Sequence, residues 1–182
     1  MTSPTPSPPT CPRCGARGRK VSHETPLALL RDEARAHLTD APVRFCRTPD
    51  CDVVYYAESG APIFTTGDVR VTVYQKSSDP DRLVCYCFGH SVRAIEDEVA
   101  ATGTSRVPDE ITEACRAGRD DCPHKNPQGA CCLGNVRQVV RAAQLARGTP
   151  AEASPSASCC SCGSDGDEPT RAGACVVEPG PT

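Results

Sequence analysis

Tryptophan is absent from this chain of 182 residues, and aromatic residues together make up only 4% of it. Proline and glycine, which interrupt helices and strands, supply 18 and 14 residues. A chain with so few large apolar side chains can bury only a modest hydrophobic core. Cross-links must therefore supply part of the stability, and the 14 cysteines are the candidates for that role.

The sequence also lacks any apolar run of about 18 residues, the length needed for a transmembrane helix. Its first residues, MTSPTPSPPTCPRCG, contain no apolar segment of the kind found in signal peptides. We therefore expect a cytoplasmic protein without a membrane span. In a reducing compartment, clustered cysteines are more often metal ligands than disulfides. A net charge of −3 gives no electrostatic case for a nucleic-acid partner, so metal ions are the expected ligands.

Catalytic patterns are missing as well. The sequence shows no Gly-rich phosphate loop, no paired carboxylates brought together by periodicity, and no recognisable Ser, His and Asp arrangement. We therefore do not expect an enzyme.

The patterns along the chain predict an α+β protein with two small domains between disordered tails. The tails are residues 1–10, rich in Pro, Ser and Thr, and residues 148–182, rich in Ala, Ser, Pro and Gly. The first domain spans 11–80 and the second spans 81–147.

Each domain has its own predicted elements. In the first, Thr25 and Pro26 are typical of a helix start, and the apolar spacing predicts a helix over 26–38. Two to four short antiparallel strands follow it, in the segments VRFC, DVVYYAE and VRVTVYQK. The second domain has three predicted helices: one capped by Ser91 and ending at Gly103, one from Pro108 to Gly118, and one following Cys132.

A first cysteine quartet combines a CPRCG knuckle with a later pair in FCRTPDC. The two residues between Cys11 and Cys14 let both sulfurs face one ion, and Cys46 and Cys51 supply a second pair. Four thiolates in this order resemble a zinc-ribbon or treble-clef site, in which a closed shell makes the zinc structural. Free thiols or CxxC redox chemistry remain the alternative reading. His23 and His37 could replace a ligand or lie on the surface.

A second quartet begins with CYCFG, in which Cys85 and Cys87 are one residue apart. That spacing is rare in zinc knuckles and suits one iron of a small cluster. The other pair is Cys122 with Cys131 or Cys132, and Cys132 opens the third predicted helix, as Cys87 opens the first. Helix N-termini would stabilise the negative charge of a [2Fe-2S] cluster. A second zinc site remains the alternative, since four thiolates accept either metal.

Together these motifs are similar to the N-terminal part of long-form CopZ proteins. The segments that carry the resemblance are CPRCG, FCRTPDCDVVYY, CYCFG and CPHKNPQGACCLGNV, and it covers residues 11 to about 145. It implies a CopZ zinc-binding domain followed by a small helical domain with the fold of bacterioferritin-associated ferredoxin (BFD-like), which binds a [2Fe-2S] cluster.

By position, the resemblance carries the zinc ligands onto the first quartet and the cluster ligands onto the second. The zinc set is Cys11, Cys14, Cys46 and Cys51, and the cluster set is Cys85, Cys87, Cys122 and Cys132, with Cys131 as the alternative to Cys132. Relatives often have a cysteine where this chain has Asp120, which leaves Cys122 as the ligand. Cys115 lies on an apolar helix face and is predicted to be a buried core thiol. His90 and His124 could tune the cluster through hydrogen bonds to sulfur or be plain surface residues.

Long-form CopZ normally continues into a heavy-metal-associated domain with a GMxCxxC copper loop, which this sequence does not contain. Its last residues instead carry Cys159, Cys160 and Cys162, with Cys175 beyond. Thiolates packed this closely suit a soft ion such as monovalent copper, and an ordinary tail without a ligand is the equal alternative.

The sequence thus predicts a CopZ-like metal-handling protein, a metallochaperone with zinc and a [2Fe-2S] cluster for single-electron transfer. Its expected partners are metal ions, a copper or other soft-metal transporter, or a redox protein. Two alternatives stay open. One is a ferredoxin-like electron carrier or redox sensor without cargo metal, and the other is a zinc-ribbon adaptor.

Overall fold

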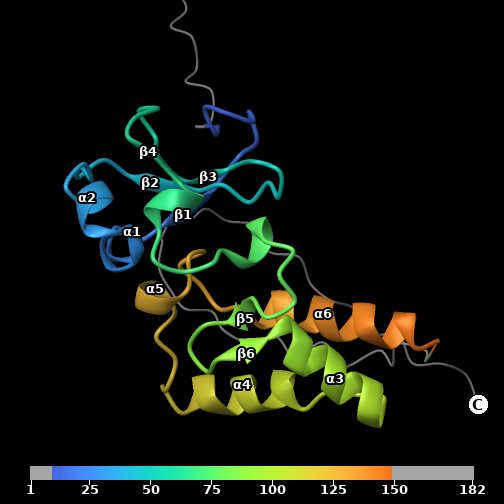
Figure 1. Cartoon of the computed structure of the whole chain (residues 1–182). Helices are drawn as coiled ribbons and strands as arrows, with labels where there is room; N and C mark the ends of the chain where they lie inside the picture. The colour runs from blue at the N-terminus through green and yellow to red at the C-terminus, as the bar shows by residue number, and fades with distance from the viewer. Residues whose placement is uncertain (1–9, 149–182) are drawn as a thin grey trace, which may run out of the picture. The chain divides into compact units, whose positions relative to one another are not determined.

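A computed structural model of the protein describes residues 10–148, which lie in one compact unit (Figure 1). Its strands are β1 (Arg19–Val21), β2 (Val43–Phe45), β3 (Val53–Ala57), β4 (Ile63–Thr65), β5 (Leu83–Cys85) and β6 (His90–Ser91). Its helices are α1 (Glu24–Leu29), α2 (Asp32–Arg35), α3 (Val92–Thr102), α4 (Val107–Arg116), α5 (Cys122–Lys125) and α6 (Leu133–Ala146), with the 3-10 turns η1 (Thr66–Asp68) and η2 (Tyr74–Lys76). Within this described range, no helix is long and apolar enough to cross a membrane.

The larger sheet is antiparallel, in the order β1-β2-β3-β4 (Figure 1). Strand β3 is buried along its whole length. Val54 and Tyr55 belong to the hydrophobic cluster between this sheet and its short helices, whereas Val53 and Tyr56 pack with three cysteines of the first quartet. A strand covered on both faces reads as a continuous apolar run, which explains the VVYY sequence.

The predicted helix over 26–38 is wrong, because the chain breaks there into α1 and α2. Leu30 is extended (φ −70°, ψ 145°), fully buried, and forms an isolated bridge with Val69. Thr25 is not the N-cap: it lies inside α1 and is buried, and His23 takes the cap position. The helical spacing of the apolar residues was real, but burying Leu30 against the segment after η1 overrode it.

The alternating valines 69, 71 and 73 do not form a strand either. Val69 and Val73 point into the core, yet the backbone makes only the bridge with Leu30 and then enters η2. The predicted strands in VRFC and DVVYYAE are confirmed as β2 and β3. Strands β1 and β4 were not predicted, because β1 (RKV) has a single apolar residue and β4 (IFT) does not alternate between apolar and polar residues.

The helical half is built from α3, α4 and α6 around a core of valines and isoleucines. All three predicted helices are confirmed. Ser91 caps α3 by accepting a hydrogen bond from the backbone N–H of Ala94 (3.2 Å), and Gly103 ends it with φ 85°. Helix α4 has Pro108 in its first turn, and α6 follows Cys132. The β5–β6 hairpin and the short α5 were not predicted, and α5 packs against α1 (Figure 1).

Candidate metal centres

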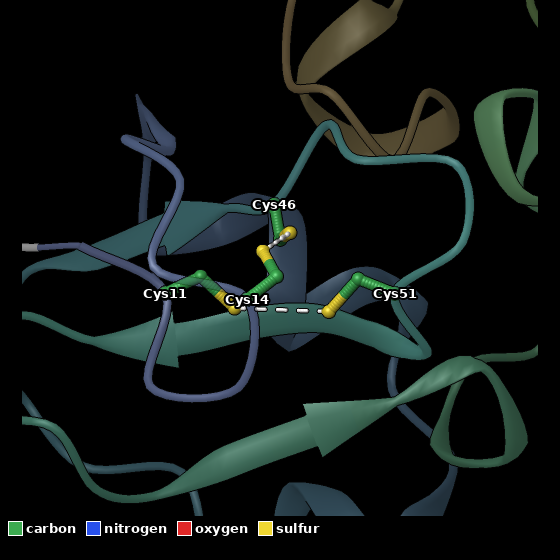
Figure 2. Close-up of side chains that lie close together, drawn as sticks. All are labelled: Cys11, Cys14, Cys46 and Cys51. Atoms are coloured by element: carbon green, nitrogen blue, oxygen red, sulfur yellow. Dashed lines mark hydrogen bonds between the residues drawn. The ribbon is translucent and has the colours of Figure 1, made fainter.

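The structure brings the four cysteines of the first quartet into one group. The Sγ atoms of Cys11, Cys14, Cys46 and Cys51 all lie within 4.8 Å of one another. Figure 2 shows these side chains converging as two close pairs. The Sγ atoms of Cys11 and Cys51 are 3.8 Å apart, and those of Cys14 and Cys46 are 3.7 Å apart. Sulfurs about 2.3 Å from one zinc ion at tetrahedral angles would be separated by about 3.8 Å. The group therefore has the dimensions of a tetrahedral zinc shell.

Local backbone geometry positions each ligand. Cys11 and Cys14 lie in a turn in which the N–H of Gly15 donates to the carbonyl of Cys11 (2.8 Å), and Gly15 adopts the left-handed conformation (φ 71°) that closes such a turn. Cys46 directly follows β2, and Cys51 comes two residues before β3. The zinc shell is thus built from one tight turn and the loop between two neighbouring strands.

The charge environment of this quartet is uneven. Cys11, Cys46 and Cys51 are buried, whereas Cys14 is exposed. A hydrogen bond between Cys14 and the Thr48 hydroxyl (3.3 Å) helps lower the pKa of Cys14 to about 6, and burial raises the pKa of Cys51 to about 12. The ammonium of Lys76 donates to the carbonyls of Thr48 (2.9 Å) and Cys51 (2.8 Å). This cation beside the site offsets part of the negative charge that four thiolates concentrate there.

The second quartet has a different arrangement, two close pairs of sulfurs. Cys87 and Cys122 are 3.6 Å apart. The thiol of Cys132 hydrogen-bonds to Cys85, which lowers the pKa of Cys85 to about 7. In the described part of the chain, only the first quartet has three or more ligand atoms within 4.8 Å of one another. The four sulfurs of the second quartet therefore do not surround a single point.

The two neighbouring candidates for the fourth ligand differ in burial. Cys132 is 2% exposed and packs in the helical core, whereas Cys131 is exposed. Cys131 is nevertheless close by: hydrogen bonds with Cys122 and Cys132 lower its pKa, and it also contacts Cys115. Cys115, predicted to be a buried core thiol, does pack against the helical core, but it is only half-buried and contacts Cys131.

The expected helix termini are only partly present around the second quartet. Cys132 is the N-cap of α6, and Cys122 begins α5. Cys87 does not open a helix. It lies in the turn of the β5–β6 hairpin, where Gly89 (φ 75°) donates to the carbonyl of Cys85 (3.0 Å), and the Asp121 N–H points at its sulfur (3.3 Å). The CYCFG sequence therefore forms a hairpin turn before the helix.

The two histidines considered as zinc ligands do not belong to the first group of sulfurs, whereas the two considered as tuning groups lie beside the second quartet, with His90 paired to Cys85 across the β5–β6 hairpin. His23 contacts the carbonyl of Thr39 (3.0 Å), and His37 is exposed. His124 pairs with Asp121 (2.6 Å), which raises the pKa of this histidine, and His90 is half-buried in β6. The tail cysteines Cys159, Cys160, Cys162 and Cys175 lie outside the described residues.

Sequence reasoning missed several residues around the two centres. They are Thr48 and Lys76 beside the first, Asp121 beside the second, and Gln75, Gln128 and Tyr86 between them. Thr48, Tyr86, Asp121 and Gln128 lie inside or beside the cysteine motifs, but none of these residues signals its contacts by type or spacing. Their positions follow from tertiary packing, and only the unusual Tyr between two cysteines could have drawn notice.

Comparison with known proteins agrees with this description of the first centre. Residues 8–70 match the CopZ family model described as a zinc binding domain. The N-terminal domain of CopZ from Archaeoglobus fulgidus superposes with a TM-score of 0.59 at 24% sequence identity, over 78% of this chain and 98% of that domain. No curated protein matches the chain. The protein therefore contains a CopZ-type zinc-binding domain at residues 8–70, and its described part has the fold of a CopZ N-terminal domain.

Proposed function

We propose that this protein is a CopZ-like metal-handling protein in which the first quartet holds a structural zinc and the second holds a [2Fe-2S] cluster. Two observations support the assignment of zinc to Cys11, Cys14, Cys46 and Cys51. Their Sγ atoms lie within 4.8 Å of one another, and the zinc-binding family model matches the same residues. A closed shell of four thiolates leaves no coordination position for a substrate, so this zinc serves folding.

The pairing of sulfurs in the second quartet carries the cluster proposal. A binuclear cluster needs two thiolates on each iron, and Cys87 with Cys122 and Cys85 with Cys132 form two such close pairs. A single zinc ion would require all four sulfurs around one point, as in the first quartet. The donor set and its pairing therefore fit a [2Fe-2S] cluster better than a second zinc.

When bound, such a cluster transfers single electrons. The chain's own part is to hold and bias that site. The N–H of Asp121 aims at the sulfur of Cys87, and the N-cap position of Cys132 places the positive end of α6 beside the site. Both favour negative charge on the sulfurs. Burial of Cys85, Cys122 and Cys132 keeps most of the ligand set away from water.

The proposed cargo is a metal ion, because thiolates are the chain's most abundant clustered ligands. We propose a cytoplasmic role in handling a soft metal ion such as copper, in contact with a transporter or a redox partner, and not an enzymatic one. The tail cysteines Cys159, Cys160 and Cys162 remain candidates for that ion because thiolates prefer soft cations.

Metal and acid-labile sulfide analysis of anaerobically prepared protein, with electron paramagnetic resonance after reduction, tests the cluster. We expect two irons and two sulfides beside one zinc, and a signal from the reduced cluster. Cys132→Ser should lose the signal and most of the iron, whereas the neighbouring Cys131→Ser should keep both, because only Cys132 is buried against Cys85. A colourless protein that contains zinc alone would contradict the proposal.

A further inference from the structure

The short turn η2 contacts the loops of both cysteine quartets. We propose that η2, through Lys76, Gln75 and Tyr74, couples the two metal centres, so that zinc in the first quartet orders the ligand loops of the second. The second quartet is a metal centre only under the function proposed above, but the coupling itself concerns the loops.

The first contact is between Lys76 and the zinc loop. Its Nζ donates to the carbonyls of Thr48 (2.9 Å) and Cys51 (2.8 Å), both in the loop from Cys46 to Cys51. These two acceptors hold the ammonium only while the loop keeps its shape. Zinc fixes that shape by joining both ends of the loop to the CPRCG turn, so the position of η2 depends on the first centre.

The second contact leads to the loop before Cys132. Gln75 donates from Nε2 to Oε1 of Gln128 (2.9 Å), and Gln128 donates in turn to the carbonyls of Ala130 (3.1 Å) and Cys131 (2.9 Å). Asn135 donates to the same Oε1 (3.1 Å). The Gln128 amide thus uses both donors and accepts twice, which fixes its orientation and with it the loop carbonyls.

The third contact reaches the CYC turn. The backbone N–H of Tyr74 donates to the hydroxyl of Tyr86 (2.8 Å), which donates to the carbonyl of Thr72 (2.8 Å). Tyr86 lies between Cys85 and Cys87, so this hydroxyl ties the hairpin turn to the segment leading into η2. Three consecutive residues therefore connect one zinc loop with two loops that carry second-quartet ligands.

Coupling of this kind is reciprocal and typically amounts to about 5-fold to 150-fold in a binding constant. Hydrogen exchange of the full chain, prepared without iron and compared with and without zinc, measures it directly. In the wild type, we expect zinc removal to speed exchange of the amides at 128–133 and 84–88 by about 5-fold or more. In Gln75→Leu, the response at 128–133 should be clearly reduced, with the remainder carried by the hydrogen bond from Tyr55 to the carbonyl of Pro127 (2.8 Å). The response at 84–88 should persist through Tyr86.

Gln144→Leu is the matched control, because Gln144 donates to the carbonyl of Gly103 (3.1 Å) within the helical half. It should keep the full zinc response. An unchanged response at 128–133 in Gln75→Leu would overturn the coupling. Zinc removal from the wild type that lowers protection equally throughout α3 and α6 would also overturn it, because that result would mean general unfolding. Since no iron is used, failure of the wild type to bind a cluster would refute the proposed function and leave this result standing.

Discussion

At the scale of single residues, burial separates positions that the sequence presents as equivalent. Cys131 and Cys132 are adjacent and chemically identical, yet only Cys132 is enclosed by the helical core beside Cys85. Likewise, Cys14 is the exposed member of a quartet whose other three thiols are buried. Spacing brings a thiol to a site, and the surrounding packing decides how it can act there.

At Gly18, which is not a metal ligand, packing determines which residue fits. A Cβ at this residue would lie 2.5 Å from the hydroxyl oxygen of Tyr56 and 2.8 Å from the carbonyl oxygen of Phe45. The Tyr56 hydroxyl also accepts a hydrogen bond from the Gly18 N–H (2.9 Å). We expect Gly18→Ala to lower the free energy of unfolding by about 1–3 kcal/mol, the usual cost of overpacking, as measured by denaturant titration of the zinc-bound protein.

Gly67→Ala provides the comparison. The nearest atom to a Cβ there is the Thr65 hydroxyl oxygen at 3.8 Å, an ordinary contact. We expect a change within about 0.5 kcal/mol at this position. Equal effects of the two substitutions would show that close approach at Gly18 is not what requires glycine.

At the scale of elements, short helices and strands are held by specific contacts between their ends. Glu98 on α3 illustrates this. Its carboxylate accepts from the hydroxyl of Ser105 (2.6 Å) and from the backbone N–H of Arg106 (3.1 Å), just before α4 begins. This carboxylate therefore fixes the connection between two helices of the core.

These contacts predict a pH dependence. The hydrogen bond from Ser105 holds the pKa of Glu98 below its ordinary value. A carboxyl with a lowered pKa in the folded state stabilises it above the unfolded-state pKa, near 4.3, and that contribution disappears as the pH falls through the folded-state pKa. We expect Glu98→Gln to lower the melting temperature at pH 6, with a difference from wild type that shrinks between about pH 5 and pH 3.

Thermal unfolding followed by circular dichroism at each pH gives this difference. Glu96→Gln is the control, because it removes an exposed carboxyl from the middle of α3, away from both ends of the helix. Its difference from wild type should stay near zero throughout. A constant difference for Glu98→Gln across the whole pH range would contradict a role for the ionised carboxylate.

At the scale of the whole molecule, two hydrophobic clusters and the first cysteine quartet stabilise the fold together. One cluster lies between the sheet and its short helices, and the other among α3, α4 and α6. Between them, the buried hydroxyl of Tyr55 in β3 donates to the carbonyl of Pro127 (2.8 Å), in the loop after α5. The sheet and the ligand loops of the second quartet are therefore in direct contact.

Loss of zinc should therefore destabilise the sheet as well as the loop from Cys46 to Cys51. We expect Cys46→Ser to reduce zinc affinity by more than about 100-fold, since even groups that only orient ligands cost 10-fold to 100-fold. The sheet half should also unfold at lower temperature, because the binding free energy of a structural zinc contributes to folding. Zinc content after dialysis and thermal unfolding measure the two effects.

Cys115→Ser is the matched control for this substitution, because Cys115 is half-buried on α4 and outside both quartets. It should retain one zinc per chain and a wild-type unfolding temperature for the sheet half. Retention of zinc by Cys46→Ser would show that the ion is held elsewhere.

The sequence by itself determined the local features: the close cysteine pairs Cys11 and Cys14, Cys46 and Cys51, and Cys85 and Cys87, the strand β3, and the helices α3, α4 and α6. Each depends on spacing within a short window, which periodicity and capping report directly. Only the tertiary structure decided the break at Leu30, the hairpin position of Cys87, the burial that separates Cys132 from Cys131, and the contacts of η2 with loops of both quartets. These depend on residues distant in the chain. Local pattern cannot encode which distant residue will cover a side chain, and in a chain with so small a core that coverage sets the outcome.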